Sequence, residues 1–202
     1  MVKSNQTDII ETKRLILRKF RITDFNDYWE NISTTKVDPT YGWKLHTTQK
    51  SVMEDLRKDI KQPYMYAIVE KTQNCVIGLI NLKRYKKDKL LNMKVGRNCR
   101  EINYLLNEKY WAQGIMPEAL KALVEYAFMT LDIPEIVIRH AEANIASGEM
   151  QEELGFKLVD RTKNYCLWGA DEQPTACIYR RMTKEEFLQR YVRTSQSPTI
   201  DA

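Results

Sequence analysis

The residues best suited to chemistry lie in one short segment, Tyr110–Leu120. The stretch before it, Arg100–Leu106, is predicted to be a strand, and apolar residues recur at helical spacing from Ala119 to Leu131 behind it. A turn of small residues between a strand and a helix leaves backbone N–H groups without partners, and the helix dipole adds positive potential at the same point. The segment therefore predicts a binding site for a phosphate or a pyrophosphate.

Of three phosphate-binding patterns, only one is compatible with this turn. A Walker loop requires Gly-x-x-x-x-Gly-Lys-Ser/Thr, and a dinucleotide fingerprint requires three spaced glycines near the first strand of a βαβ unit; neither is present here. The third is Gln/Arg-x-x-Gly-x-Gly/Ala, which binds the pyrophosphate of coenzyme A. With this pattern the chain resembles the GNAT superfamily of N-acetyltransferases, and within it the RimJ/RimL-type branch.

The resemblance extends from about Glu11 to Phe187 and rests on several segments that follow one another in the family's order. These segments are Glu11–Arg18, Glu101–Tyr104, Tyr110–Ala119, Asn144–Ser147 and Leu154–Phe156. The resemblance implies acetyl-CoA as co-substrate and no metal. It also implies a set of cofactor-binding residues: Leu105, Leu106, Ala112, Gln113, Gly114, Ile115, Met116, Pro117, Asn144 and Ser147.

Three positions of the turn depart from the family pattern. Trp111 stands where many members have Gln or Arg, and Met116 occupies the Gly/Ala position and makes the turn bulkier. Pro117 suits the first helical position because its fixed φ fits a helix, but it removes one N–H that a phosphate could use. An ordinary strand-to-helix connection without a ligand is the alternative interpretation.

Acetyl transfer to an amine needs a base for the ammonium proton, a donor to the thioester carbonyl and an acid for the departing thiolate. The resemblance makes Glu101 the first candidate for the base; the alternative is a carboxylate paired with Arg97 or Arg100. Glu118 is a weaker candidate because an acidic residue in the first helical turn is favoured by the dipole alone. Backbone N–H groups near Leu105 and Leu106 are expected to face the carbonyl.

The expected acid is missing from its usual place. Many family members have a Tyr three residues before Leu-Gly-Phe, where this chain has Gln151. The RimJ/RimL-type motif Asn-x-x-Ser occurs as Asn144–Ser147, so the resemblance gives Asn144 to the pantetheine region and makes Ser147 a weak acid or a contact of the thiol. The alternatives are a helix cap for Asn144, a helix-face hydroxyl for Ser147 and a proton taken from solvent, since a thiol with a pKa near 8.5 leaves readily.

Candidates for the acceptor side precede the second predicted helix. Trp43 and His46 match a Trp and a His that RimJ/RimL-type sequences often have beside the acceptor groove, and Tyr28 is a further candidate for its wall. Each has a plain structural alternative, because aromatic residues near helices are usually part of a core. His140, at the end of a predicted strand, is expected to be a packed or hydrogen-bonded residue.

Composition favours one cytoplasmic enzyme domain. The 202 residues carry a net charge of +5, which helps an anionic cofactor approach but is too dispersed to predict nucleic acid binding. No apolar run is long enough to span a membrane, and no signal peptide is expected. The four cysteines form no Cys-x-x-Cys pair, so we expect reduced thiols and no zinc site. We predict a flexible N-terminus over 1–10, a single domain over 11–191 and a disordered tail over 192–202.

The order of predicted elements indicates an α/β (α+β) fold with a mixed sheet. The resemblance implies a mostly antiparallel sheet of about seven strands flanked by helices, in which Glu101–Leu106 and Pro134–His140 run parallel and splay apart around the pantetheine arm. Local signals add two helix ends. Gly155 is predicted to close a helix over Asn144–Leu154, and Thr183–Glu186 is a capping box for a terminal helix.

These observations predict an acetyl-CoA-dependent N-acetyltransferase that acts on a primary amine, either a protein N-terminus or a small amine, by direct attack. Two other classes stay open. One is a non-catalytic acyl-CoA-binding module, which Gln151, Met116 and Pro117 favour. The other is a basic protein that binds RNA or the ribosome through the run Lys83–Lys89, whose plain interpretation is a solvated hairpin tip. A homodimer is compatible with the sequence.

Overall fold

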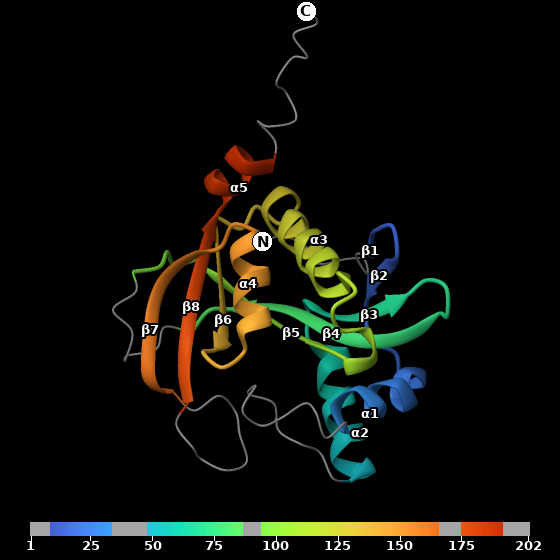
Figure 1. Cartoon of the computed structure of the whole chain (residues 1–202). Helices are drawn as coiled ribbons and strands as arrows, with labels where there is room; N and C mark the ends of the chain where they lie inside the picture. Colours follow the sequence, from blue (N-terminus) through green and yellow to red (C-terminus); the bar gives the residue numbers. More distant parts are fainter. Residues whose placement is uncertain (1–8, 34–47, 87–93, 166–174, 192–202) are drawn as a thin grey trace, which may run out of the picture.

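The computed structural model describes residues 9–33, 48–86, 94–165 and 175–191, which form a central sheet with helices on both faces (Figure 1). The strands are β1 (Ile10–Glu11), β2 (Leu15–Arg18), β3 (Met65–Glu70), β4 (Cys75–Arg84), β5 (Arg100–Leu106), β6 (Glu135–Ala141), β7 (Lys157–Tyr165) and β8 (Thr175–Thr183). The helices are α1 (Phe25–Ser33), α2 (Gln49–Lys61), α3 (Ile115–Met129), α4 (Ile145–Glu153) and α5 (Lys184–Tyr191). Single 3-10 turns, η1 (Ile22–Asp24) and η3 (Glu108–Tyr110), precede α1 and α3.

The sheet follows the order β1-β2-β3-β4-β5-β6-β8-β7, and its strand pairs are antiparallel apart from β5 and β6. The mixed α/β class is confirmed. The mostly antiparallel sheet of about seven strands is confirmed as well: the described residues form eight, of which two-residue β1 is too short to leave a period in the sequence.

The parallel pair is short. Arg100, Glu101 and Ile102 of β5 pair with Ile136, Val137 and Ile138 of β6, and both strands then continue beyond the paired segment, to Leu106 and Ala141. A parallel pair needs a crossover connection, which α3 supplies here. Beyond Ile102 and Ile138, the edges of β5 and β6 that face each other are therefore available to a group other than a strand.

Two hydrophobic cores fix the helices on opposite faces of the sheet. The larger core packs α3 and Phe187 of α5 against one face, and it includes Leu120, Leu123 and Phe128, which are fully buried. The smaller core packs α1 and α2 against the other face. Helices α1, α2 and α3 each bury an apolar face, as expected from their sequence period.

The predicted helix ends are confirmed in two places. Gly155 has φ of +94°, a left-handed conformation that closes α4 and that glycine adopts without strain. At the start of α5, the Thr183 backbone N–H donates to Glu186 Oε2 at 2.9 Å and the Glu186 N–H donates to Thr183 Oγ1 at 3.2 Å, which is the predicted capping box.

Gly78 allows β4 to lie close to β5. A Cβ atom at this position would lie 2.4 Å from the carbonyl oxygen of Leu105, a backbone atom that cannot move aside cheaply. We expect Gly78→Ala to reduce the free energy of unfolding by about 2 kcal/mol or more. Urea denaturation of this variant beside Gly96→Ala, where the nearest atom is a side-chain oxygen at 3.4 Å, provides the comparison. Equal stability of the two variants would contradict the proposed crowding.

Candidate active site

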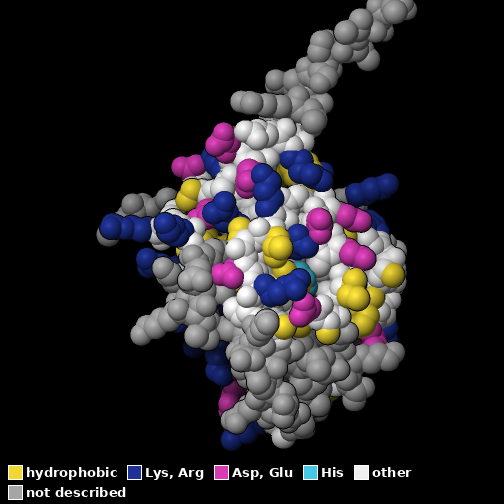
Figure 2. Space-filling model, turned by 60° about the vertical axis from the view of Figure 1, so that its left-hand side comes forward, with side chains coloured by type: hydrophobic (Ala, Val, Ile, Leu, Met, Phe, Trp, Pro, Cys, Tyr) yellow, Lys and Arg dark blue, Asp and Glu magenta, His cyan; other side chains and the backbone are white. Residues whose placement is uncertain are grey.

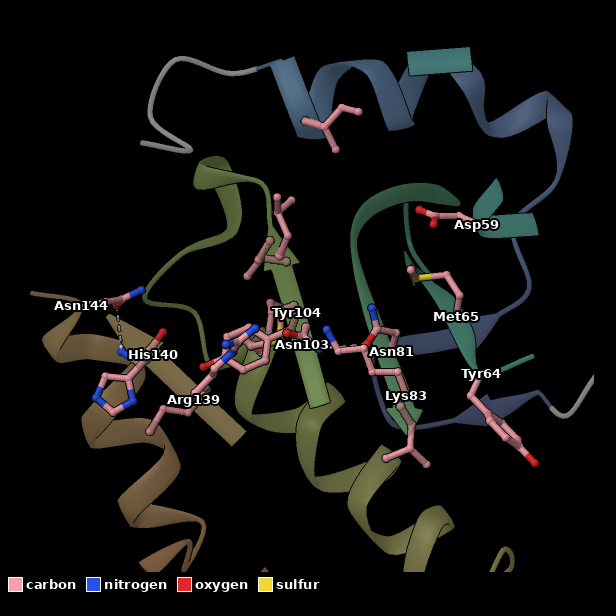
Figure 3. A pocket seen from close by; sticks show the side chains of 18 of the residues that line it. Asp59, Tyr64, Met65, Asn81, Lys83, Asn103, Tyr104, Arg139, His140 and Asn144 are labelled. Carbon is pink, nitrogen blue, oxygen red and sulfur yellow. Dashed lines mark hydrogen bonds between the residues drawn. The ribbon is translucent and has the colours of Figure 1, made fainter. Parts of the chain in front are cut away.

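A cavity of about 1210 Å³ opens where β5 and β6 separate. The second halves of both strands line it, together with the turn before α3, the first residues of α3 and α4, and residues of α1, α2, β3 and β4. In Figure 3, Tyr104 and Asn103 of β5 lie between His140 and Asn144 on one side and Asp59 and Met65 on the other. The cavity therefore joins the two faces at which a cofactor and an acceptor are expected.

The turn before α3 has the backbone shape of an anion site. Ala112 and Gly114 both have positive φ, +55° and +69°, and Gly114 is the N-cap of α3. Successive residues of this kind turn backbone N–H groups toward one point, and a non-glycine residue held at positive φ is a strain that often marks a functional site. The indole N–H of Trp111 donates to the carbonyl of Leu106 at 2.8 Å and ties the turn to β5.

Arg14 holds the turn from outside. Its guanidinium donates to the carbonyl oxygens of Gln113 and Gly114 at 2.8 and 3.0 Å, and its Nε lies 2.6 Å from Glu118 Oε2. Glu118 also accepts hydrogen bonds from Thr12 and from the Arg14 backbone N–H. Because Arg14 binds carbonyl oxygens, it orients the peptide groups of the turn; Glu118 is part of this clamp.

Met116 and Pro117, two of the three positions that depart from the family pattern, are accommodated in the structure. Met116 is only 7% exposed and belongs to the larger core, while it also lines the cavity. Pro117 lies in the first turn of α3, as its geometry favours. Leu105, Leu106, Ala112, Gly114 and Ile115 are among the lining residues. Gln113 is not among them, and its side chain donates to the carbonyl of Lys109 at 2.8 Å.

Glu101 is placed outside the cavity lining. Its carboxylate lies 2.9 Å from Arg139 Nε of β6 and 3.7 Å from Lys83 Nζ of β4, and the side chains of Glu101 and Arg139 are less than a tenth exposed. The carboxylate is thus held in a buried ion-pair network by two cations. Its partners come from the two neighbouring strands, which spacing along the sequence does not reveal.

The start of α4 carries the Asn-x-x-Ser motif into the cavity. Asn144 and Ser147 both line it, and Asn144 Oδ1 accepts from the Ser147 backbone N–H at 3.1 Å, so Asn144 also caps the helix. Buried Gln151, on the same helix, bonds to His140 and to Tyr104. Sequence reasoning did not select Tyr104 or the bond that joins it to Gln151.

The opposite wall carries a half-buried acidic group that sequence reasoning missed. Asp59 of α2 lines the cavity and accepts a hydrogen bond from the Tyr28 hydroxyl at 2.7 Å. Burial raises the pKa of Asp59 to about 6, and nearby Asp55 adds to this, while Tyr28 opposes it. The sequence spacing could have indicated this position of Asp59. Asp59 lies seven residues after Val52 and three after Leu56, so it shares the face of α2 on which these two buried residues lie.

Tyr28 is thus placed in the cavity wall, as predicted for the acceptor side. Trp43 and His46, the other two acceptor candidates, lie outside the described residues. Asn103 Nδ2 donates to Asn81 Oδ1 at 3.3 Å on the cavity floor between the two walls.

Comparison with known protein families matches residues 14–157 to the acetyltransferase (GNAT) domain family. The chain belongs to the GNAT acetyltransferase family. As a GNAT enzyme it is an N-acetyltransferase that uses acetyl-CoA, in agreement with the turn and the parting strands.

Individual relatives of this GNAT protein are distant. The uncharacterized N-acetyltransferase YnaD of Bacillus subtilis (strain 168) is 23% identical over 148 residues, which cover 73% of this chain and 82% of the relative. A GNAT-family acetyltransferase from Bacillus anthracis superimposes with a TM-score of 0.75 at 20% identity and covers 88% of this chain and 99% of that one. The ribosomal L7/L12 alpha-N-protein acetyltransferase RimL in complex with coenzyme A gives 0.68 at 21% identity, with 87% and 98% coverage. These structural likenesses establish the fold.

Over 9–33, 48–86, 94–165 and 175–191, no helix is long and apolar enough to cross a membrane. Within the same ranges, no group of three His, Cys, Asp or Glu side chains is arranged to hold a metal ion.

The raised pKa of Asp59 predicts a pH-dependent gain in stability on its removal. Folding favours the protonated carboxyl, so its contribution is fully present below about pH 3.8 and is lost as the pH rises through about 6. We expect Asp59→Asn, which can still accept from Tyr28, to stabilise the protein by about 1 to 2 kcal/mol at pH 8 and by almost nothing at pH 4. Thermal melting at both pH values tests this, with Glu54→Gln on the exposed side of α2 as control. A gain that is equal at both pH values would contradict it.

The Arg14 clamp predicts a loss of cofactor affinity when it is removed. Without the guanidinium, the carbonyl groups of Gln113 and Gly114 can rotate, and the N–H groups of the turn lose their common direction. We expect Arg14→Ala to raise the Kd for coenzyme A about tenfold or more, measured by calorimetry. Lys13→Ala removes an exposed neighbouring charge and is the matched control; an equal loss in both variants would point to general electrostatics instead.

Proposed function

We propose that this GNAT protein transfers an acetyl group from acetyl-CoA to a primary amine by direct attack, and that it belongs to the RimJ/RimL-type branch. The observation that carries the proposal is the single cavity between β5 and β6, which has the anion-binding turn at one side and the Asp59–Tyr28 wall at the other. Cofactor and acceptor can therefore meet without either leaving its own binding surface.

The cofactor half of the cavity fits coenzyme A. The backbone N–H groups around Ala112 and Gly114 suit the pyrophosphate. Arg14 binds the carbonyl oxygens of Gln113 and Gly114 and so fixes the orientation of the peptide groups in this turn. Beyond Ile102 and Ile138, β5 and β6 no longer pair with each other, so their facing edges offer strand-like hydrogen bonds to the amides of the pantetheine arm, with Asn144 beside them. Acetyl-CoA, when bound, supplies the thioester carbon that the amine attacks, and the backbone near Leu105 and Leu106 is proposed to polarise its carbonyl.

The acceptor half favours a cationic group. Asp59 and Asp55 of α2 both line this part of the cavity, and Tyr28 fixes the Asp59 carboxylate by its hydrogen bond. A carboxylate with a pKa near 6 holds an ammonium group at neutral pH and accepts a proton more readily than an ordinary aspartate. Glu101 as the base stays a prediction, and a direct comparison with Asp59 tests it.

The leading acceptor is a protein N-terminal amine, as in the name of the RimL neighbour, with a small amine as the second possibility. The two rival classes predicted from sequence find less support. Met116, which favoured the non-catalytic acyl-CoA-binding module, packs its side chain into the larger hydrophobic core. On the face drawn in Figure 2, the basic and acidic side chains are interspersed, so the described atoms there form no basic stripe for RNA. Lys83 of the basic run pairs with Glu101.

Titration of the purified protein with acetyl-CoA in a calorimeter is the decisive first experiment. We expect micromolar binding and equal affinity for desulfo-CoA, followed by turnover on N-terminal peptides or on small amines in an acceptor screen. Binding without turnover on any amine would favour an acyl-CoA-binding module. No binding, together with salt-sensitive RNA binding, would favour the nucleic acid class.

Three variants assign the roles within the site. We expect Asp59→Asn to lower kcat/KM for the amine by about 10²-fold or more while the Kd for acetyl-CoA stays unchanged. Glu101→Gln should lower stability, because it removes the carboxylate charge from the buried ion pair with Arg139. Asn144→Ala should raise the cofactor KM. If Glu101→Gln abolished turnover in a fully folded enzyme while Asp59→Asn did not, Glu101 would be the base.

A further inference from the structure

A chain of hydrogen bonds links β6, α4 and β5 at the cavity wall. His140 Nδ1 lies 2.9 Å from Gln151 Oε1, and Gln151 Nε2 donates to the Tyr104 hydroxyl oxygen at 3.0 Å. The Ser147 side chain also hydrogen-bonds the Tyr104 phenol. His140, Tyr104 and Ser147 line the cavity, whereas Gln151 is fully buried behind them.

The protonation of His140 fixes the direction of this chain. Burial lowers the pKa of His140, and nearby Arg180 acts in the same direction, while the bond to Gln151 opposes them. Burial and Arg180 both favour the neutral ring, and because the Gln151 oxygen Oε1, which can only accept, faces Nδ1, the ring carries its proton on Nδ1 and donates it to this oxygen. The Gln151 amide group then faces Tyr104, so the phenol oxygen accepts this bond.

Close packing holds the ring in that orientation. A Cβ atom at Gly148 would lie 2.8 Å from His140 Nε2, so α4 approaches the ring to a distance that only glycine permits at this position. The His140 ring, the Gln151 amide and the Tyr104 phenol are consequently arranged before any ligand binds. Such preorganisation lowers the cost of using the group at the end of the chain.

The phenol keeps one donor free for the cavity. Its oxygen accepts from Gln151, while its own O–H can turn toward the space between the strands. Burial raises the pKa of Tyr104, and the bonds from Ser147 and Gln151 only partly oppose this. The hydroxyl therefore stays protonated across the neutral range and remains a hydrogen-bond donor.

We propose that Tyr104 is a catalytic residue whose phenol donates its hydrogen bond to the sulfur of coenzyme A and supplies the proton when the C–S bond breaks. The proposal rests on the proposed function, because it needs a thioester in the cavity. As the new C–N bond forms, the electron pair of the C–S bond goes to sulfur and the phenol proton follows it. The phenolate regains a proton from solvent, and the ammonium proton leaves separately through the base.

Gln151 acts here as a positioning residue. An amide cannot release a proton to a thiolate at neutral pH, but its two ends connect His140 to Tyr104 and set the direction of the phenol. Ser147, the acid suggested by the sequence motif, contributes by its contact with the same phenol.

The test measures the pKa of the thiol of bound coenzyme A from the ultraviolet absorbance of its thiolate. The desulfo-CoA complex serves as the blank and removes the signal of the protein's own cysteines. Tyr104→Phe keeps the ring and removes only the hydroxyl. We expect it to raise the bound thiol pKa by about one unit. We also expect kcat to fall roughly 100-fold while the Kd for coenzyme A changes less than about threefold.

Two further variants make the result specific. Tyr191→Phe removes a phenol hydroxyl that donates to the Leu154 carbonyl outside the cavity, and it should leave the bound thiol pKa at the wild-type value. Ser147→Ala should shift it less than Tyr104→Phe does. If Ser147→Ala raised the thiol pKa and Tyr104→Phe did not, Ser147 would be the donor and the proposal would be overturned.

The experiment also separates this proposal from the proposed function. Normal binding of coenzyme A with an unchanged thiol pKa in Tyr104→Phe would overturn the role of Tyr104 alone. Failure of the wild-type protein to bind coenzyme A would overturn both.

Discussion

The site depends on one feature of backbone pairing, the end of the parallel ladder between β5 and β6 after Ile102 and Ile138. Buried strand edges normally find hydrogen-bond partners in a neighbouring strand. Here both strands continue for several residues past their pairing, and the space between them is the cavity. An extended ligand with its own amide groups can take the place of the missing strand.

A buried ion pair lies at the point where the strands part. Arg139 of β6 follows the last paired residue, Ile138, and its guanidinium reaches back to Glu101 within the paired segment of β5. Lys83 of β4 approaches the same carboxylate from the other side. Loss of one partner of a buried ion pair is costly, so this contact stabilises the pairing of Arg100–Ile102 with Ile136–Ile138. Glu101 therefore has a structural role at the site.

The two walls of the cavity are held by different chemistry. Arg14 binds the turn before α3 through charge-assisted hydrogen bonds from a residue 100 positions away in sequence. The opposite side of the gap is held by neutral groups, buried His140, buried Gln151 and half-buried Tyr104, which are joined by hydrogen bonds. Charges lie where a phosphate is expected, and neutral donors lie where a thioester is expected, which matches the demands of each end of coenzyme A.

The sequence by itself determined the fold class and the local elements, because these depend on short-range periodicity and on caps such as Gly155 and the Thr183–Glu186 box. The family was indicated by the resemblance of its motifs, not by periodicity. The sequence also predicted that the turn at Ala112–Pro117 and the Asn144–Ser147 motif belong to one site, and residues of both segments line the same cavity. Only the tertiary structure decided that Glu101 is paired with Arg139, that Asp59 faces the cavity and that Tyr104 meets Gln151. These contacts join residues from different strands and helices, and their pairing depends on strand order and register, which no local period encodes.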